Sequence, residues 1–155
     1  MTRASRSPIP QFETVDDAFS LLRAQGLRLS AARRNLLIGL FTAHRLVTAD
    51  ELADGLGGAV PPLDLPVVYR NLETLEELGI VRHVHLGHGP SRYAIAAGGP
   101  KEYLVCDVCG EVQTVSPSQI DDARAVVLAG VGFTPSFEHF AMRGICAKCL
   151  AGTQA

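Results

Sequence analysis

The stretch DLPVVYRNLETLEELGIVRHVHLGHGPSRYAI, residues 64–95, determines the fold that the sequence predicts. Its first half predicts a helix, because Asp64 is a good N-cap, Pro66 suits the first turn and Gly79 suits the end. Its second half is apolar or alternating around a turn at 87–90, which predicts a β-hairpin. A helix followed by a β-hairpin is how a winged helix-turn-helix domain ends.

The polar face of this helix carries the first candidate functional residues. Tyr69, Arg70 and Asn71 are side chains that can reach base edges or hold phosphates, so we predict that they contact DNA. The alternative is an ordinary amphipathic helix with a solvated polar face. Seven arginines within or beside the predicted elements favour a basic surface, although the formal net charge is −2. They are Arg28, Arg33, Arg34, Arg45, Arg70, Arg82 and Arg92.

Helical patterns also precede this stretch. Apolar spacing and N-cap residues predict helices over 14–25, 30–43 and 48–56. The last of these carries a capping box, in which Thr48 is followed three positions later by Glu51. Three helices, a fourth helix and a hairpin form the layout of a winged helix domain.

The pattern of residues changes after a linker of small residues. Alternating and capped segments then predict two strands, a helix and a third strand, over 102–106, 112–115, 118–128 and 137–143. This unit has too little core to be stable alone, so we expect metal binding and dimerisation to stabilise it.

These patterns together predict an α+β protein. We expect a flexible tail over 1–13, a winged helix-turn-helix DNA-binding domain over 14–96, a hinge over 97–100 and a small zinc-containing α/β dimerisation domain over 101–155. No apolar run approaches the ~20 residues of a membrane span, and the first residues lack the apolar middle of a signal peptide. We therefore expect a cytoplasmic protein without a membrane partner, whose cysteines are reduced.

All four cysteines fall into two Cys-x-x-Cys pairs, Cys106 with Cys109 and Cys146 with Cys149. Two such pairs supply four thiolates at distances that suit tetrahedral Zn²⁺, so we expect a structural zinc site. The alternative is two redox dithiols, or four buried thiols that never meet. Four thiolates leave zinc no open position, and the sequence contains no phosphate loop or paired nucleophile and base. We therefore expect a protein that is not an enzyme.

Four motifs occur in combination along the chain. They are GLRLSAARRNLL from residue 26, VVYRNLETLEELGIV from residue 67, CDVCG from residue 106 and GICAKC from residue 144. Together they resemble the Fur family of bacterial metal-responsive repressors, from about Ala18 to Cys149. The resemblance implies a homodimer that binds an operator in double-stranded DNA. It also implies that Tyr69 and Arg70 lie in the major groove, with Arg28 near the backbone or the minor groove.

The segments HVHLGHG and EHFAMRGIC most resemble the nickel-responsive branch of this family, called Nur. In that branch a three-histidine metal site bridges the two domains, and its ligands match His83, His85 and His139 of this chain. Three imidazoles suit Ni²⁺, Zn²⁺, Co²⁺ or Fe²⁺, so the identity of this second metal stays open. The alternative is that each histidine is an ordinary surface residue.

Other metal sites of the family are changed here. The hinge sensory site usually takes ligands from a histidine-rich run, which is GPKEY at 99–103 here, and from an acid, which is Ala94 here. A further site would map to Glu102, Asp121 and Glu138, and three carboxylates without an imidazole suit Zn²⁺ or Ni²⁺ poorly. We therefore expect a degenerate hinge site and a solvated acidic patch.

The sequence favours a dimeric DNA-binding repressor that responds to a divalent transition metal. One alternative is a regulator of the same fold that responds to no metal, or that responds to thiol oxidation. Another is a zinc-binding interaction module that does not bind DNA. The metal content of the purified protein distinguishes a sensor from a protein that holds structural zinc alone.

Overall fold

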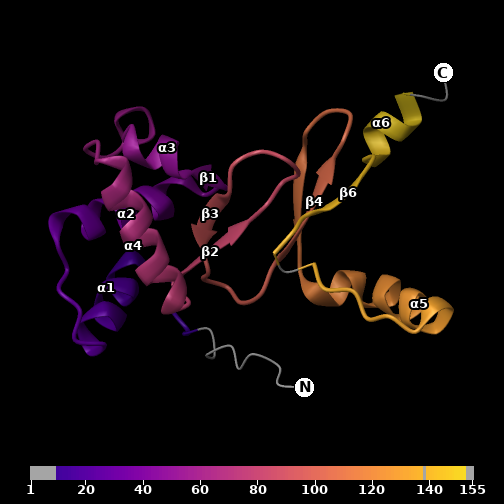
Figure 1. The fold of residues 1–155 in the computed structure, drawn as a ribbon, viewed down its shortest axis with the longest axis horizontal. Coiled ribbons are helices and arrows are strands. Elements are labelled where there is room, and N and C mark those ends of the chain that lie inside the picture. Colours follow the sequence, from indigo (N-terminus) through magenta and orange to yellow (C-terminus); the bar gives the residue numbers. More distant parts are fainter. Residues whose placement is uncertain (1–9, 138, 153–155) are drawn as a thin grey trace. The chain divides into compact units, whose positions relative to one another are not determined.

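The computed structural model of the protein describes residues 10–137 and 139–152 (Figure 1). They fall into two units. The first contains the chain up to His83 together with Ser91–Gly99, and the second contains Val84–Pro90 and the chain from Pro100 onward. The fold class is α+β, as the sequence predicted, with helices and two small sheets. Most of the predicted tail at 1–13 lies outside the described residues.

The helices of the first unit begin at residues that cap them. Thr14 and Thr48 each form a capping box with the acidic residue three positions later, and the Ser30 hydroxyl accepts a hydrogen bond from the Arg33 N–H. Asp64 has the N-cap backbone conformation, but its side chain makes no capping hydrogen bond. The helices are α1 (Val15–Ala24), α2 (Ala31–Ala43), α3 (Ala49–Ala53), the 3-10 turn η1 (Leu56–Gly58) and α4 (Leu65–Glu77).

The apolar faces of these helices form one core, around which α1, α2 and α4 gather in Figure 1. Its largest fully buried side chains include Leu22, Leu36, Leu37, Leu52, Leu72, Leu75 and Ile80. Full burial of one leucine contributes roughly 2 kcal/mol to stability. Because α4 buries Leu72 and Leu75 in this core, the opposite face of the helix is held in a fixed outward position.

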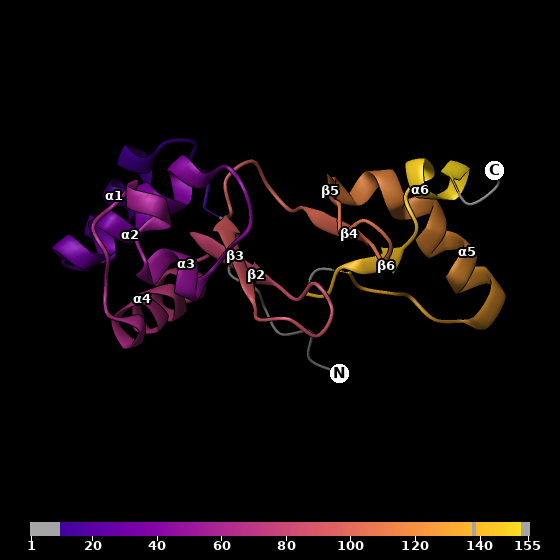
Figure 2. The same cartoon turned by 90° about the horizontal axis from the view of Figure 1, so that it is seen from above.

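A three-stranded sheet completes the first unit, with the order β1-β3-β2. Strand β2 (Val81–Val84) and strand β3 (Arg92–Ile95) form the predicted hairpin, which Figure 2 shows from above. Strand β1 (Val47–Thr48) pairs antiparallel with β3, with Val47 opposite Tyr93. Strand β1 was not predicted, because two residues carry no recognisable strand pattern.

One side chain ties the last residues of the first unit to the hairpin. Arg82 on β2 donates hydrogen bonds to the backbone oxygens of Gly99 and Ile95, both at 3.1 Å. A third hydrogen bond, of 3.4 Å, goes to the backbone oxygen of Ala97. The chain that was predicted as a hinge, 97–100, therefore starts as an ordered and bonded segment.

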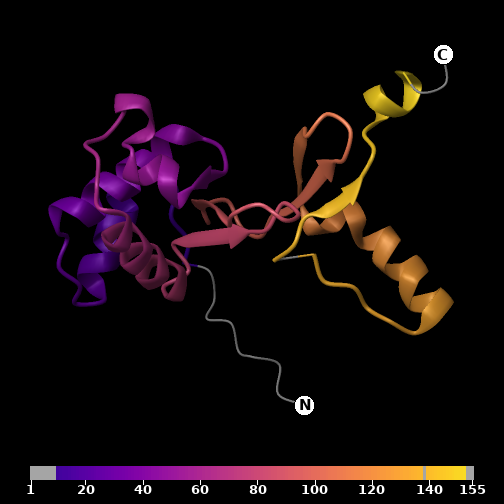
Figure 3. The same ribbon diagram turned by 45° about the horizontal axis from the view of Figure 1, so that its top comes forward.

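The second unit is built on a sheet of order β5-β4-β6. Strand β4 pairs antiparallel with β5 and parallel with β6. Figure 3 shows this sheet, with the short helix α6 following β6. The elements are β4 (Glu102–Cys106), β5 (Val112–Val115), the 3-10 turn η2 (Pro117–Ile120), α5 (Asp121–Val131), β6 (Met142–Gly144) and α6 (Ala147–Gly152).

The bounds predicted for the strand at 137–143 were wrong. Regular pairing begins only at Met142, and Phe140 before it makes an isolated parallel bridge to His85. His85 belongs to Val84–Pro90, the last residue of β2 and the loop that follows it, which lies in the second unit. Alternation in the sequence could not show that this segment pairs with a loop rather than with a strand.

The second unit exposes most of the large apolar side chains. Among the described residues, all large hydrophobic side chains classed as exposed lie in this unit, except Tyr69. They are Val108, Val112, Val126, Leu128, Val131, Phe133, Phe140, Ile145 and Leu150. Helix α5 buries none of its residues within the single chain. In the described ranges, no helix has both the length and the apolar character needed to cross a membrane.

Candidate metal centres and nucleic-acid interface

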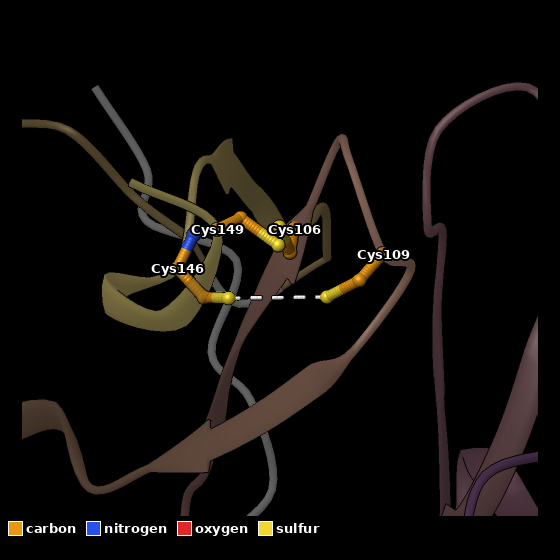
Figure 4. Close-up of side chains that lie close together, drawn as sticks. All are labelled: Cys106, Cys109, Cys146 and Cys149. Atoms are coloured by element: carbon orange, nitrogen blue, oxygen red, sulfur yellow. Dashed lines mark hydrogen bonds between the residues drawn. The ribbon is translucent and has the colours of Figure 1, made fainter. Parts of the chain in front are cut away.

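The four cysteines come together in the second unit, as Figure 4 shows. Cys106 ends β4 and Cys109 lies in the turn after it. Cys146 directly precedes α6 and Cys149 lies within it. The sulfur atoms all lie within 4.8 Å of one another, and the Cys109 and Cys146 sulfurs are 3.8 Å apart. Four sulfurs around Zn²⁺ at ~2.3 Å in a tetrahedron are about 3.8 Å apart. The donor set therefore fits zinc.

The electrostatic surroundings of the four thiols also suit a cation. Backbone N–H groups of Cys109, Cys146 and Val108 face the Cys106 sulfur and lower the pKa of this thiol to about 6. The neighbouring Cys146 and Cys109 groups raise the pKa of Cys149 to about 12. One thiolate thus forms readily, whereas four thiolates need a positive charge at their centre. The 3.8 Å separation of Cys109 and Cys146 is also far longer than a disulfide of ~2.05 Å.

Two of the three candidate histidines lie side by side in the second unit. The His85 N–H donates to the backbone oxygen of His139, and the Ala141 N–H donates to the backbone oxygen of His85, both at 3.0 Å. The two imidazole rings are 5.4 Å apart between centroids, and a ring nitrogen of each lies within 4.8 Å of one on the other. The ring of Phe140 stacks on His85 at 5.2 Å.

The third candidate, His83, lies two residues earlier, on β2 in the first unit. Its ring is partly buried beside Tyr93, at 6.0 Å between centroids, and its Nδ1 contacts the carboxylate of Glu76 on α4. His83 and His85 were both predicted in the domain over 14–96, but the chain passes from one unit to the other between them. The contact of His83 with Glu76 was not predicted, because nothing in the spacing of the two residues indicates it.

Two of the predicted DNA contacts lie exposed on α4. The side chain of Tyr69 is 47% exposed, and Arg70 next to it is also exposed. The segment before α2 presents Arg28, which is exposed as well. These positions leave the three side chains available to a nucleic acid.

The position predicted for Asn71 was wrong. This residue is only 9% exposed and lies on the buried side of α4 rather than on its polar face. Its amide oxygen accepts a hydrogen bond from Arg33 Nε at 3.0 Å, and its Nδ2 donates to the Val67 oxygen at 2.8 Å. Arg33 also donates to the backbone oxygen of Arg28 at 2.8 Å. Asn71 therefore links α4 to α2 and to the segment that carries Arg28.

We expect Asn71→Ala to lower the free energy of unfolding by roughly 1–3 kcal/mol, because it leaves the Arg33 guanidinium without a buried acceptor. Urea unfolding of the variant and of the wild type measures this difference. Asn35→Ala, a change of the same type on α2, serves as the control. A variant that unfolds like the wild type but binds DNA more weakly would instead place Asn71 among the DNA contacts.

The expected solvated acidic patch is also wrong for Glu102. This residue is 2% exposed, and Arg124 on α5 forms ion pairs with both Glu102 and Asp121. The Arg124 guanidinium also lies 5.4 Å from the centre of the Phe137 ring. Glu138 lies outside the described residues. Arg124 therefore occupies both described carboxylates as an ion-pair partner, and its positive charge at this place disfavours a divalent metal there.

Known proteins resemble this chain over most of its length. The ferric uptake regulator family matches residues 24–142. The peroxide-responsive repressor PerR of Staphylococcus saprophyticus is 24% identical over 135 residues, which cover 87% of this chain and 90% of the relative. The Helicobacter pylori ferric uptake regulator Fur, described with three functional metal binding sites, has a TM-score of 0.67 at 19% identity, over 91% of this chain and 97% of that one.

A further solved structure, a zinc uptake regulator in complex with zinc and DNA, has a TM-score of 0.57 at 24% identity. It covers 91% of this chain and 95% of its own. The two structures support the fold, and the family match extends over most of both units. The chain belongs to the ferric uptake regulator family.

Proposed function

We propose that this protein is a dimeric DNA-binding repressor that responds to a divalent transition metal. The observation that carries the proposal is the exposed pair Tyr69 and Arg70 on α4, within a helix-turn-helix unit. The family consists of transcriptional regulators, so the protein is not an enzyme, as its sequence predicted. A protein that acts on the chromosome works in the cytoplasm, where we place it.

The dimer forms, in this proposal, through the second unit. Its exposed apolar residues would otherwise face water, and α5 lacks a buried face in the single chain. A cavity of about 400 Å³, lined in part by Leu104, Met142 and Ile145, opens on the same unit. A symmetric dimer presents two DNA-binding units, which fit an operator that is an inverted repeat.

Two metals have different roles in the proposal. The four cysteines hold a structural Zn²⁺, because their sulfurs match its tetrahedral spacing. His83, His85 and His139 hold the regulatory metal, and the adjacency of His85 and His139 supports this assignment. Imidazole ligands accept Ni²⁺, Zn²⁺, Co²⁺ and Fe²⁺, so nickel is one candidate among these.

The DNA-binding proposal is tested by substitutions on α4. We expect Tyr69→Ala or Arg70→Ala to weaken specific operator binding by roughly 1–3 kcal/mol, because each removes a contact to a base or a phosphate. Affinities are measured on an operator selected from random duplexes. Arg23→Ala, which removes the same charge from the end of α1, is the control. Equal affinity of the wild type and Arg70→Ala would overturn the assignment of α4.

The role of Arg28 differs from that of the α4 residues. A backbone contact carries no sequence information, so Arg28→Ala should weaken binding to all duplexes by a similar factor. The slope of log affinity against log salt should also become shallower by about one. A loss that is confined to the selected operator would place Arg28 on a base edge instead.

A further inference from the structure

The end of α4 touches one of the proposed metal ligands. Glu76 lies in the last turn of this helix, and its carboxylate contacts Nδ1 of His83 on β2. The side chain of Glu76 is 36% exposed and that of His83 is 20% exposed, so the contact is partly shielded from water. Both residues belong to the first unit, and the contact is therefore part of one packed body.

The chemistry of this contact fixes the form of the imidazole. An ionised carboxylate only accepts hydrogen bonds, so Nδ1 of His83 keeps its proton and the Nδ1–H donates a hydrogen bond to Glu76. A neutral imidazole protonated at Nδ1 has its lone pair on Nε2, which is the atom that a metal then coordinates. Histidines that bind metals commonly donate their other N–H to a carboxylate, which orients the ring and makes it more basic.

The contact between Glu76 and His83 also links the proposed metal ligand His83 to α4, the helix that carries Tyr69. Glu76 lies seven residues after Tyr69, which is about two turns or ~10 Å along α4. Buried Leu72 and Leu75 hold the intervening turns in the core. A restraint on the His83 ring therefore acts on the end of a helix whose successive turns are packed in one core.

We propose that Glu76 is a positioning residue, which holds His83 in its metal-binding form and connects the regulatory metal to α4. This inference rests on the proposed metal response and adds the residue through which His83 would reach the DNA-binding helix. Glu76 acts through its hydrogen bond to His83 and does not itself coordinate the metal.

The test compares two adjacent glutamates. Co²⁺ is titrated into zinc-loaded protein, and its binding is followed by visible absorption against a competing chelator. We expect Glu76→Ala to weaken Co²⁺ binding 10- to 100-fold, as loss of such an orienting carboxylate typically does. Glu77→Ala removes the same charge from the same turn, at an exposed position, and should leave the affinity unchanged. Glu76→Gln keeps a hydrogen-bond acceptor and should recover part of the loss.

A second readout is the ratio of operator affinities with and without Co²⁺, which should fall in Glu76→Ala and stay at the wild-type value in Glu77→Ala. An equal loss of operator affinity with and without metal would mean that Glu76 only stabilises α4, which overturns the inference. His83→Ala separates the two proposals. If His83→Ala binds Co²⁺ like the wild type, the histidine site itself is wrong. If His83→Ala loses Co²⁺ while Glu76→Ala matches Glu77→Ala, the site stands and the role of Glu76 is wrong.

Discussion

Cys106→Ser is expected to release zinc and to unfold the second unit. A structural zinc site contributes on the order of 10 kcal/mol to folding, and this unit has little else to stabilise it. Among the described residues from Pro100 onward, the buried apolar side chains are those of Tyr103, Cys106 and Val115. The measurements are zinc content, the thermal unfolding curve and the mass in solution, which should show aggregated or monomeric protein.

Val108→Ser is the matched control for this experiment. Val108 lies in the same turn as Cys109, is 64% exposed and offers no ligand, so the variant should keep its zinc and its unfolding curve. A Cys106→Ser protein that stays dimeric and unfolds like the wild type would show that the four thiols do not form a structural site.

The second large effect concerns the regulatory metal. Operator binding by the wild type should tighten about a hundredfold when the metal is added, which corresponds to ~2.7 kcal/mol of coupling between the two sites. The double variant His83→Ala/His139→Ala should lose this response, because it removes two of three proposed ligands. Titrations with Ni²⁺, Zn²⁺, Co²⁺ and Mn²⁺ measure the response and identify the preferred metal.

His88→Ala is the control, since His88 is exposed in the same loop as His85 and is not among the proposed ligands. If the wild type binds its operator equally with every metal, and also after chelation that spares the thiolate-bound zinc, the proposed metal response is wrong. The chain would then be a metal-independent or redox-responsive member of its family.

Local rules were sufficient to predict much of this fold. The capping boxes at Thr14 and Thr48 and the N-cap at Ser30 act within three or four residues, so the sequence specifies where α1, α2 and α3 begin. The two Cys-x-x-Cys pairs are also local motifs, and each predicted two metal ligands at a turn. The structure brings all four sulfurs together.

The errors came from contacts between residues far apart in sequence. Asn71 follows Val68 by three residues and so lies on the apolar side of α4, but its polar side chain suggested the opposite face. Its amide is paired there with Arg33, which lies 38 residues earlier. Glu102 is buried against Arg124, 22 residues later, so its charge suggested a solvated position that it does not have. Neither partner could be identified from periodicity, which describes one element at a time.

The assignment of Val84–Pro90 to the second unit has a consequence for dissecting this protein. The chain passes between the units three times, after His83, after Pro90 and after Gly99. A fragment that ends at residue 96 would keep this loop but lose the segment at 139–141, to which His85 is hydrogen-bonded. Its freed backbone groups would form an open edge, which invites pairing between fragments. The two units therefore alternate along the sequence. Replacing either unit without disturbing the other requires a junction at each of the three crossings.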